Sequence, residues 1–245
     1  NKLRTTDDLP EVIYAREYDA AISPNGNIPV HAFNLISPTF FANSSTGNKY
    51  SLWVNVYGVS ERYLNVYGEK DLRAQMNQFF HRTYTHPVDG TTLDMKMLCN
   101  WYWYDETAIL ETGKGTKDWN FYRYAETLLS AAEAIAQSSG VNAEAAGYLA
   151  QVKARANMEG KDVSTIASEL QRLGKQAFIE ECWKERLREF PLEMKIWDDC
   201  VRTGKFPQIS ATNKGEVQFV DLIGAKNGSG ATFKATDLYW PIPVN

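Results

Sequence analysis

Residues Tyr122–Ala134 read YRYAETLLSAAEA, and this stretch decides the fold class of the chain. Its apolar residues, with Phe121 before them and Ile135 and Ala136 after them, recur at steps of three and four. Such spacing puts these side chains on one face of an α-helix. Gly140 is suited to end this helix, because glycine adopts the left-handed conformation at little cost. The sequence therefore predicts an amphipathic helix that ends at Gly140.

A second helix follows after a short turn. Asn142 can cap its first turn with its side-chain oxygen. Its inner face carries small and aliphatic residues, namely Ala145, Ala146, Leu149, Val152 and Ala156. Two helices joined by a short turn form a hairpin, the unit of tetratricopeptide-like repeats. We find no second copy with the same period, and we predict a mainly α fold that contains tetratricopeptide-like helical hairpins.

The helical pattern continues toward residue 205. A third stretch begins near Ser164, and its inward residues are predicted to be Ile166, Leu170, Leu173, Ala177, Ile179 and Trp183. Pro191 interrupts this helix, because proline lacks an amide donor and clashes with the preceding turn. The helical period resumes at Leu192 and ends at Gly204.

Residues 1–118 differ from the helical part, because turn formers and aromatic residues are dense there and the helical period is weak. Residues 11–18 and 95–104 are rich in β-branched or aromatic residues and predict short strands or extended segments. Residues 60–66 and 71–80 are candidates for short helices. We expect a loop-rich, aromatic-rich lobe over residues 1–118, a helical lobe over 119–205, and an extended tail over 206–245 that packs on the helices.

The composition restricts the function. The chain has 245 residues and a net charge of −4, with acidic and basic residues interspersed. No long run of Lys or Arg is present to neutralise phosphates, so we expect no nucleic-acid partner. No apolar stretch approaches the roughly 20 residues that cross a bilayer. The 7 Trp, 13 Tyr and 11 Phe residues suit both a core and a surface that stacks on flat apolar faces.

No carboxylate pair suggests an enzyme. A glycosidase needs two carboxylates held across one sugar ring. The acidic pairs at 180–181 and 198–199 are adjacent on predicted helices, so their side chains diverge. Nothing in the sequence selects a more distant pair. We therefore predict a protein that is not an enzyme.

The histidines and cysteines give no metal or nucleophile motif. His81 and His86 lie near Cys99, but their spacing matches no zinc motif, and no nucleophile elbow is present. We interpret these histidines as surface or capping groups and predict neither a metal nor a cofactor. Cys182 and Cys200 can form a disulfide only if their helices come close, which the sequence leaves open.

Several segments resemble, in the correct order, the SusD/RagB family of nutrient-binding outer-membrane lipoproteins. YRYAETLLSAAEA resembles the central helix of that family almost residue for residue. The other matching segments are EVIYAREYDA at 11–20, DLR at 71–73, YLAQVKARA at 148–156, ERLREFPLE at 185–193, DDCVRTGK at 198–205 and PIP at 241–243. Some positions depart from the family pattern. Ala150 and Lys153 replace a usual Asn and Arg, Met194 replaces a usual Gly and Ile196 a usual Arg, and Pro191 lies inside a segment that is normally continuous.

This resemblance implies a non-catalytic receptor at the surface of a bacterial outer membrane. Such a receptor captures an oligosaccharide or polysaccharide for import through a SusC-like TonB-dependent transporter. We expect the N-terminal half of the family, with its lipid-anchoring cysteine, to lie outside this chain, so that only that anchor contacts the membrane. A peptide-binding RagB-like member and a helical-repeat scaffold without a small ligand remain alternatives.

The candidate ligand contacts lie in the loop-rich lobe. A sugar site needs aromatic faces for the ring and polar side chains for the hydroxyls. The best local fit is Phe40, Phe41, Asn43, Lys49, Tyr50 and Trp53. Trp101 and Trp103 form a second candidate, because alternate side chains of an extended segment share one face. That face is a stacking platform if it meets solvent and core if it is interior, and the usual burial of Trp favours core.

The charged motif residues are predicted to organise packing. Arg123, Glu126 and Glu133 lie three and seven residues apart, a spacing that allows pairs on a helix surface. Arg155, Arg186 and Arg202 can clamp carboxylates between packed helices. The charged positions of the family's segment are occupied here by Glu185, Arg186, Glu189, Glu193, Asp199 and Arg202.

Overall fold

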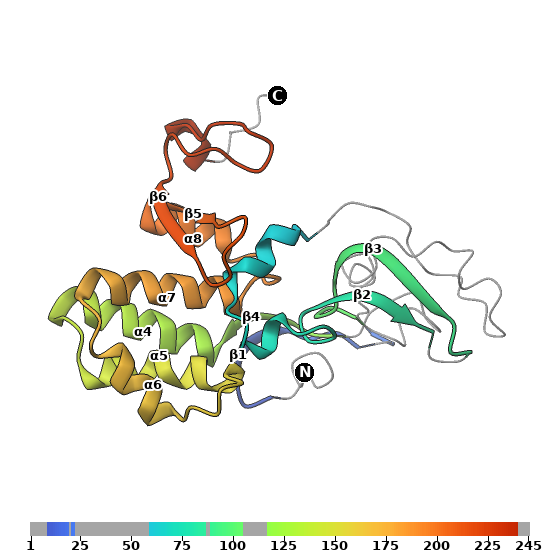
Figure 1. Ribbon diagram of the computed structural model, residues 1–245, viewed down its shortest axis with the longest axis horizontal. Helices are drawn as coiled ribbons and strands as arrows, with labels where there is room; N and C mark the ends of the chain where they lie inside the picture. The colour runs from blue at the N-terminus through green and yellow to red at the C-terminus, as the bar shows by residue number, and fades with distance from the viewer. Residues whose placement is uncertain (1–8, 20, 23–58, 87–88, 105–116, 240–245) are drawn as a thin grey trace.

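The computed structural model describes residues 9–19, 21–22, 59–86, 89–104 and 117–239. Within these residues the fold is mainly helical with short strands, which confirms the predicted class. Figure 1 shows helices stacked at one end of the molecule and a β-hairpin at the other. The elements, with η for 3-10 helices, are β1 (Val12–Arg16), η1 (Glu61–Val66), η2 (Leu72–Ala74), β2 (Phe80–Thr85), β3 (Thr92–Asn100), β4 (Trp119–Arg123), α4 (Tyr124–Ser139), α5 (Ala143–Ala156), α6 (Val163–Leu170), α7 (Lys175–Glu189), α8 (Ile196–Thr203), β5 (Lys205–Ile209), β6 (Val217–Asp221) and η4 (Ala235–Leu238).

Helices α4 and α5 form the predicted hairpin. Gly140 follows α4 with a φ of 84°, and the Asn142 side chain accepts a hydrogen bond from the Ala145 amide at 2.9 Å. The expected inner face of α5 is buried throughout. Phe121 is not part of α4, contrary to prediction, because residues 119–123 pair with β1 and leave its ring exposed. The assignment of this hairpin to a tetratricopeptide-like repeat stays a prediction.

The third predicted helix is two helices, α6 and α7. Residues 171–174 form a turn between them, and Gly174 has the extended backbone angles φ −63° and ψ 156°. Helix α7 therefore starts at Lys175, and its buried positions only partly follow the spacing predicted for one continuous helix. Leu173 and Ala177 face solvent, contrary to prediction, while Ile166, Leu170 and Ile179 are buried as predicted. Helix α7 ends before Pro191, as expected.

Helix α7 is buried on two sides. Phe178 and Cys182 belong to a core that α4, α5 and α6 complete. Leu187, nearer its C-terminal end, packs in a second core with Tyr67, Phe80 and other residues of the β2–β3 region. Because both flanks are covered, the charged side chains of this helix cannot all reach water. They must find partners inside the protein.

The strands form three antiparallel two-stranded sheets, β1–β4, β2–β3 and β5–β6. The predicted strand at 11–18 is β1, and it pairs with β4 more than 100 residues later. Of the predicted helix at 71–80 only Leu72–Ala74 is helical. The β5–β6 hairpin lies against α7, where Phe219 meets Trp183 edge-on at 5.2 Å. No helix among the described residues is both long and apolar enough to cross a membrane.

Candidate functional site

Ion pairs link the elements that meet at the C-terminal half of α7. We call the connected set the central network. It joins β1 and η2, from the aromatic-rich part of the sequence, to β4, α5 and α7. Its members are Glu11, Asp71, Arg73, Arg123, Lys153, Arg155, Glu181, Glu185, Arg188, Glu189 and Glu193.

Arg73 connects η2 to α7. Its Nε donates to Asp71 Oδ1 at 3.0 Å, and its Nη1 lies 2.8 Å from Glu185 Oε1 and 2.9 Å from Glu189 Oε2. Burial alone raises the pKa of Glu185, but Arg73 and two further cations outweigh burial and lower this pKa to about 2. Glu185 is therefore ionised at neutral pH although it is 1% exposed.

Arg123 serves three carboxylates at once. Its Nε and Nη2 donate to Glu193 at 3.0 and 2.6 Å, and its Nη1 donates to Glu189 at 3.0 Å and to Glu11. The predicted pair between Arg123 and Glu126 on one helix surface is wrong. Arg123 precedes α4 in an extended conformation, so its side chain reaches α7 instead.

A second group of ion pairs, the α8 cluster, joins α4, α7 and α8. It consists of Glu126, Glu133, Arg186, Lys195, Asp199 and Arg202. Arg202 donates to both oxygens of Glu133, at 2.8 and 3.0 Å, and Arg186 Nε lies within hydrogen-bond distance of both oxygens of Asp199. Arg155 bridges two carboxylates in the central network, Glu11 and Glu189, with one bond to each.

Sequence reasoning omitted several members of the central network from the candidate residues. Arg73 lies in the DLR segment, which the sequence identifies only as a segment that resembles the family. Arg188 follows Glu185 by three residues, the spacing that their ion pair uses. Lys153 and Glu181 pair across α5 and α7, which one sequence cannot reveal.

Two of the departures from the family pattern, Met194 and Ile196, have structural consequences. Met194 has a φ of 59°, in the left-handed region that favours glycine, and its side chain is exposed. Ile196 packs against the second core. The neighbouring Lys195 supplies a cation here, since its Nζ lies 3.0 Å from Glu126 Oε2.

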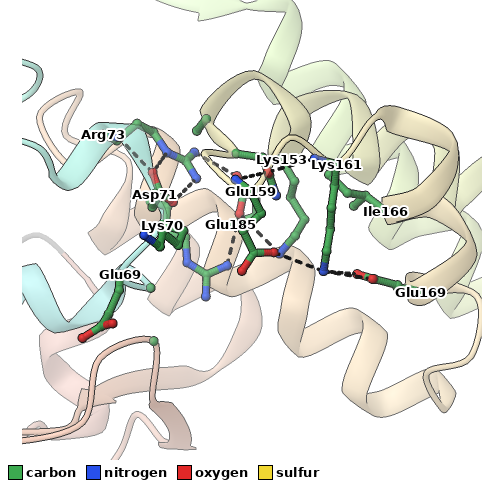
Figure 2. Close-up of a pocket in the computed structure, with 15 residues that line it drawn as sticks. Glu69, Lys70, Asp71, Arg73, Lys153, Glu159, Lys161, Ile166, Glu169 and Glu185 are labelled. Atoms are coloured by element: carbon green, nitrogen blue, oxygen red, sulfur yellow. Dashed lines mark hydrogen bonds and ion pairs between the residues drawn. The ribbon is translucent and has the colours of Figure 1, made fainter.

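Clefts open beside the central network, and two of them share Arg73. The first has a volume of about 580 Å³, and the described residues that line it carry charges of both signs and include no aromatic residue. Figure 2 shows Arg73, Asp71 and Glu185 together in this cleft, with Lys161 and Glu169 paired farther along it. The second cleft, of about 590 Å³, shares Arg73 and has apolar walls that include Leu72 and Phe79.

The candidate tryptophans divide into buried and half-buried. Residues 101–104 form a turn after β3, so the alternation expected of an extended segment does not apply. Trp103 is core, since it is 2% exposed, stacks on Trp119 at 4.7 Å and donates to the Leu192 carbonyl. Trp101 is half-buried and stacks on Tyr104 at 4.3 Å. The other candidates, Phe40, Phe41, Asn43, Lys49, Tyr50 and Trp53, lie outside the described residues.

His81 and His86 are buried, so their interpretation as surface groups is wrong. His81 Nδ1 lies 3.2 Å from the Thr83 carbonyl, and His86 Nδ1 accepts from the Asp89 amide at 3.4 Å. Within the described part of the chain no group of three or more His, Cys, Asp or Glu residues could hold a metal ion.

The three cysteines are buried free thiols, so Cys182 and Cys200 do not form a disulfide. Burial raises the pKa of Cys99 to about 11 and that of Cys200 to about 11. Because the thiolate is the reactive form, these side chains are unreactive at neutral pH.

Solved structures share this fold. A SusD superfamily protein from Parabacteroides distasonis is 25% identical with a TM-score of 0.76, and the match covers 96% of this chain and 47% of that one. The surface glycan-binding protein A from Bacteroides uniformis is 19% identical with a TM-score of 0.61, covering 95% and 46%. A SusD superfamily protein from Bacteroides fragilis is 18% identical with a TM-score of 0.55, covering 90% and 44%.

The chain thus spans about half the length of these structures. No curated protein matches the chain. The model of the SusD family matches residues 41–245, which include most of the central network and the whole α8 cluster. The chain belongs to the SusD family.

Proposed function

We propose that the protein is a non-catalytic cell-surface receptor for an oligosaccharide or polysaccharide. The observation that carries this proposal is the family match over residues 41–245. A protein of the same fold is a surface glycan-binding protein, which supports the class of ligand. We further propose that a lipid anchor outside this chain holds the receptor at the outer membrane and that it passes its ligand to a SusC-like TonB-dependent transporter.

The proposal assigns ligand binding to the lobe formed by residues 1–118 and support to the helices. The central network favours this division, because ion pairs of Glu11 and Arg73 connect that lobe to β4, α5 and α7. A binding surface held on a rigid frame loses less conformational entropy when its ligand binds. The packed helices would supply that frame.

Within this lobe we propose that Trp53 is the main stacking residue. Phe40, Phe41, Asn43, Lys49 and Tyr50 are its proposed companions. Trp101 stays a second candidate, because part of its side chain reaches the surface. Trp103 does not belong to the proposed site, since its ring is buried in the core.

The test is calorimetry or affinity electrophoresis with a panel of purified polysaccharides. We expect the wild type to bind at least one neutral polysaccharide and Trp53→Ala to weaken that binding about tenfold, or ~1.4 kcal/mol. Tyr239→Ala removes an aromatic ring that is 77% exposed and lies outside the proposed site, so it serves as the control. Equal binding by wild type and Trp53→Ala would remove Trp53 from the site.

The same panel separates the alternatives. Binding of short peptides in place of every glycan would favour a RagB-like receptor. Absence of binding to either class would favour a scaffold without a small ligand. An activity that releases reducing sugar from the polysaccharide and that co-purifies with the protein would contradict the non-catalytic part of the proposal.

A further inference from the structure

Counted over the described residues, the central network contains one more carboxylate than cations. Its acidic members are Glu11, Asp71, Glu181, Glu185, Glu189 and Glu193, and its basic members are Arg73, Arg123, Lys153, Arg155 and Arg188. The adjacent α8 cluster has three acids and three bases, so it offers no spare cation. If all members are ionised, the network carries a surplus negative charge in a largely buried place, which is energetically costly.

The number of cations paired with each carboxylate indicates which carboxylate is least compensated. Glu185 faces Arg73, Arg188 and Lys153, at 2.8, 3.1 and 3.9 Å. Glu189 likewise pairs with Arg73, Arg123 and Arg155. In the part of the chain that the structure describes, Glu193 pairs only with Arg123, and Arg123 also pairs with Glu189 and Glu11.

Among the described residues, no second cation forms an ion pair with Glu193. The groups that face it are Arg123 from β4, Glu189 from α7, Lys195 before α8 and Tyr102 after β3. Lys195 pairs with Glu126. The buried hydroxyl of Tyr102 has no hydrogen-bond partner among the described residues. Burial raises the pKa of Glu193 above its usual range, and Arg123 offsets this only in part.

We propose that the central network takes up one proton from solution at Glu193 under mildly acidic conditions, which removes the surplus charge and tightens β1 and β4 against α7. The proton adds to a carboxylate oxygen, so the neutral side chain gains an O–H donor and keeps an oxygen that accepts from Arg123. This inference does not depend on which ligand the protein binds.

The direction of the pH effect follows from linkage. A carboxyl group with a raised pKa binds its proton more readily in the folded than in the unfolded protein. The folded state should therefore become more stable as pH falls from neutral toward 4.5, the ordinary value for Glu. Below that pH stability should fall, because Glu189, whose pKa is lowered by its cations, and Glu185, with its pKa of about 2, lose their ion pairs when they take up protons.

Urea unfolding of wild type and Glu193→Gln at pH 7.5 and 5.5 tests the proposal, because glutamine mimics the neutral acid. The midpoint of the variant should lie above that of the wild type at pH 7.5, and the difference between the two midpoints should be smaller at pH 5.5. Glu181→Gln is the matched control within the network, since the pKa of Glu181 is lowered. It should lower the midpoint at both pH values. Parallel pH curves for wild type and Glu193→Gln would overturn the proposal.

A direct titration keeps the proposal testable if the variant does not fold. Carbon-13 NMR of glutamate-labelled wild-type protein should show the Glu193 carboxyl titrating with a midpoint above 4.5. The amide of Tyr124, which donates to the Glu11 carbonyl at 2.7 Å, reports on docking of the β1 segment. Its hydrogen-exchange protection, corrected for the intrinsic rate, should increase between pH 7.5 and 5.5. A Glu193 midpoint at or below 4.5, or unchanged Tyr124 protection, would reject the proposal.

Discussion

The backbone of Met194 adopts a left-handed conformation, which is unfavourable for a residue with a Cβ atom. At a φ of 59° an L-residue pays a steric cost of about 1–2 kcal/mol, while glycine there loses only its extra backbone entropy of about 0.5–1 kcal/mol. The Met194 side chain is 64% exposed, so its removal sacrifices little packing. We expect Met194→Gly to raise the free energy of unfolding by about 0.5–1 kcal/mol in urea titrations.

Met158 provides the matched control for this variant. It is also exposed, but its φ is not positive. Met158→Gly should therefore lower the free energy of unfolding by about 0.5–1 kcal/mol, since only the entropic cost of glycine applies. A loss of stability in Met194→Gly equal to that in Met158→Gly would show that position 194 carries no strain.

At the residue scale, the sequence predicts local chemistry well and distant partners poorly. The capping role of Asn142 and the ends of helices at Gly140 and Gly204 depend on a few neighbouring residues, and the structure confirms them. The partners of Arg123 come from positions 11, 189 and 193. No local spacing reveals such contacts, because folding brings those residues together.

At the element scale, the α4–α5 hairpin offers a test of local stabilisation. The Asn142 side chain satisfies the otherwise unpaired Ala145 amide in the first turn of α5. Asn142→Ala should lower the free energy of unfolding by about 1 kcal/mol, whereas Asn142→Asp, which keeps an acceptor, should stay within about 0.5 kcal/mol of wild type. Equal losses in both variants, measured by urea unfolding, would mean that the cap contributes nothing.

The predicted elements are wrong in two places, where a turn interrupts a continuous apolar period and where strand pairing overrides a helical pattern. The apolar period runs on through Leu173 and Ala177, so the sequence favours one helix where the turn at residues 171–174 makes two. Phe121 fits the period of α4, but pairing with β1 draws it into β4. Tertiary contacts override a local pattern in both cases, and a single sequence does not contain them.

At the scale of the whole molecule, the central network fastens the aromatic-rich part of the chain to the helices. Arg73 is the contact from η2, and its partners Glu185 and Glu189 are both 5% exposed or less in their side chains. Removal of one member of a buried ion pair leaves a charge without compensation, which typically costs 3–5 kcal/mol. The network should therefore decide whether the two parts of the fold unfold together.

Arg82 gives a control of the same chemistry on the surface, because its pair with Glu61 has side chains 43% and 57% exposed. We expect Arg73→Ala to lower the free energy of unfolding by about 3–5 kcal/mol, and Arg82→Ala by less than about 1 kcal/mol. Fluorescence and far-UV circular dichroism should give one common urea transition in wild type. In Arg73→Ala they should separate, with the Trp-rich β2–β3 region losing its structure before the helices. A single transition in Arg73→Ala, or equal losses in the two variants, would show that other contacts hold the parts together.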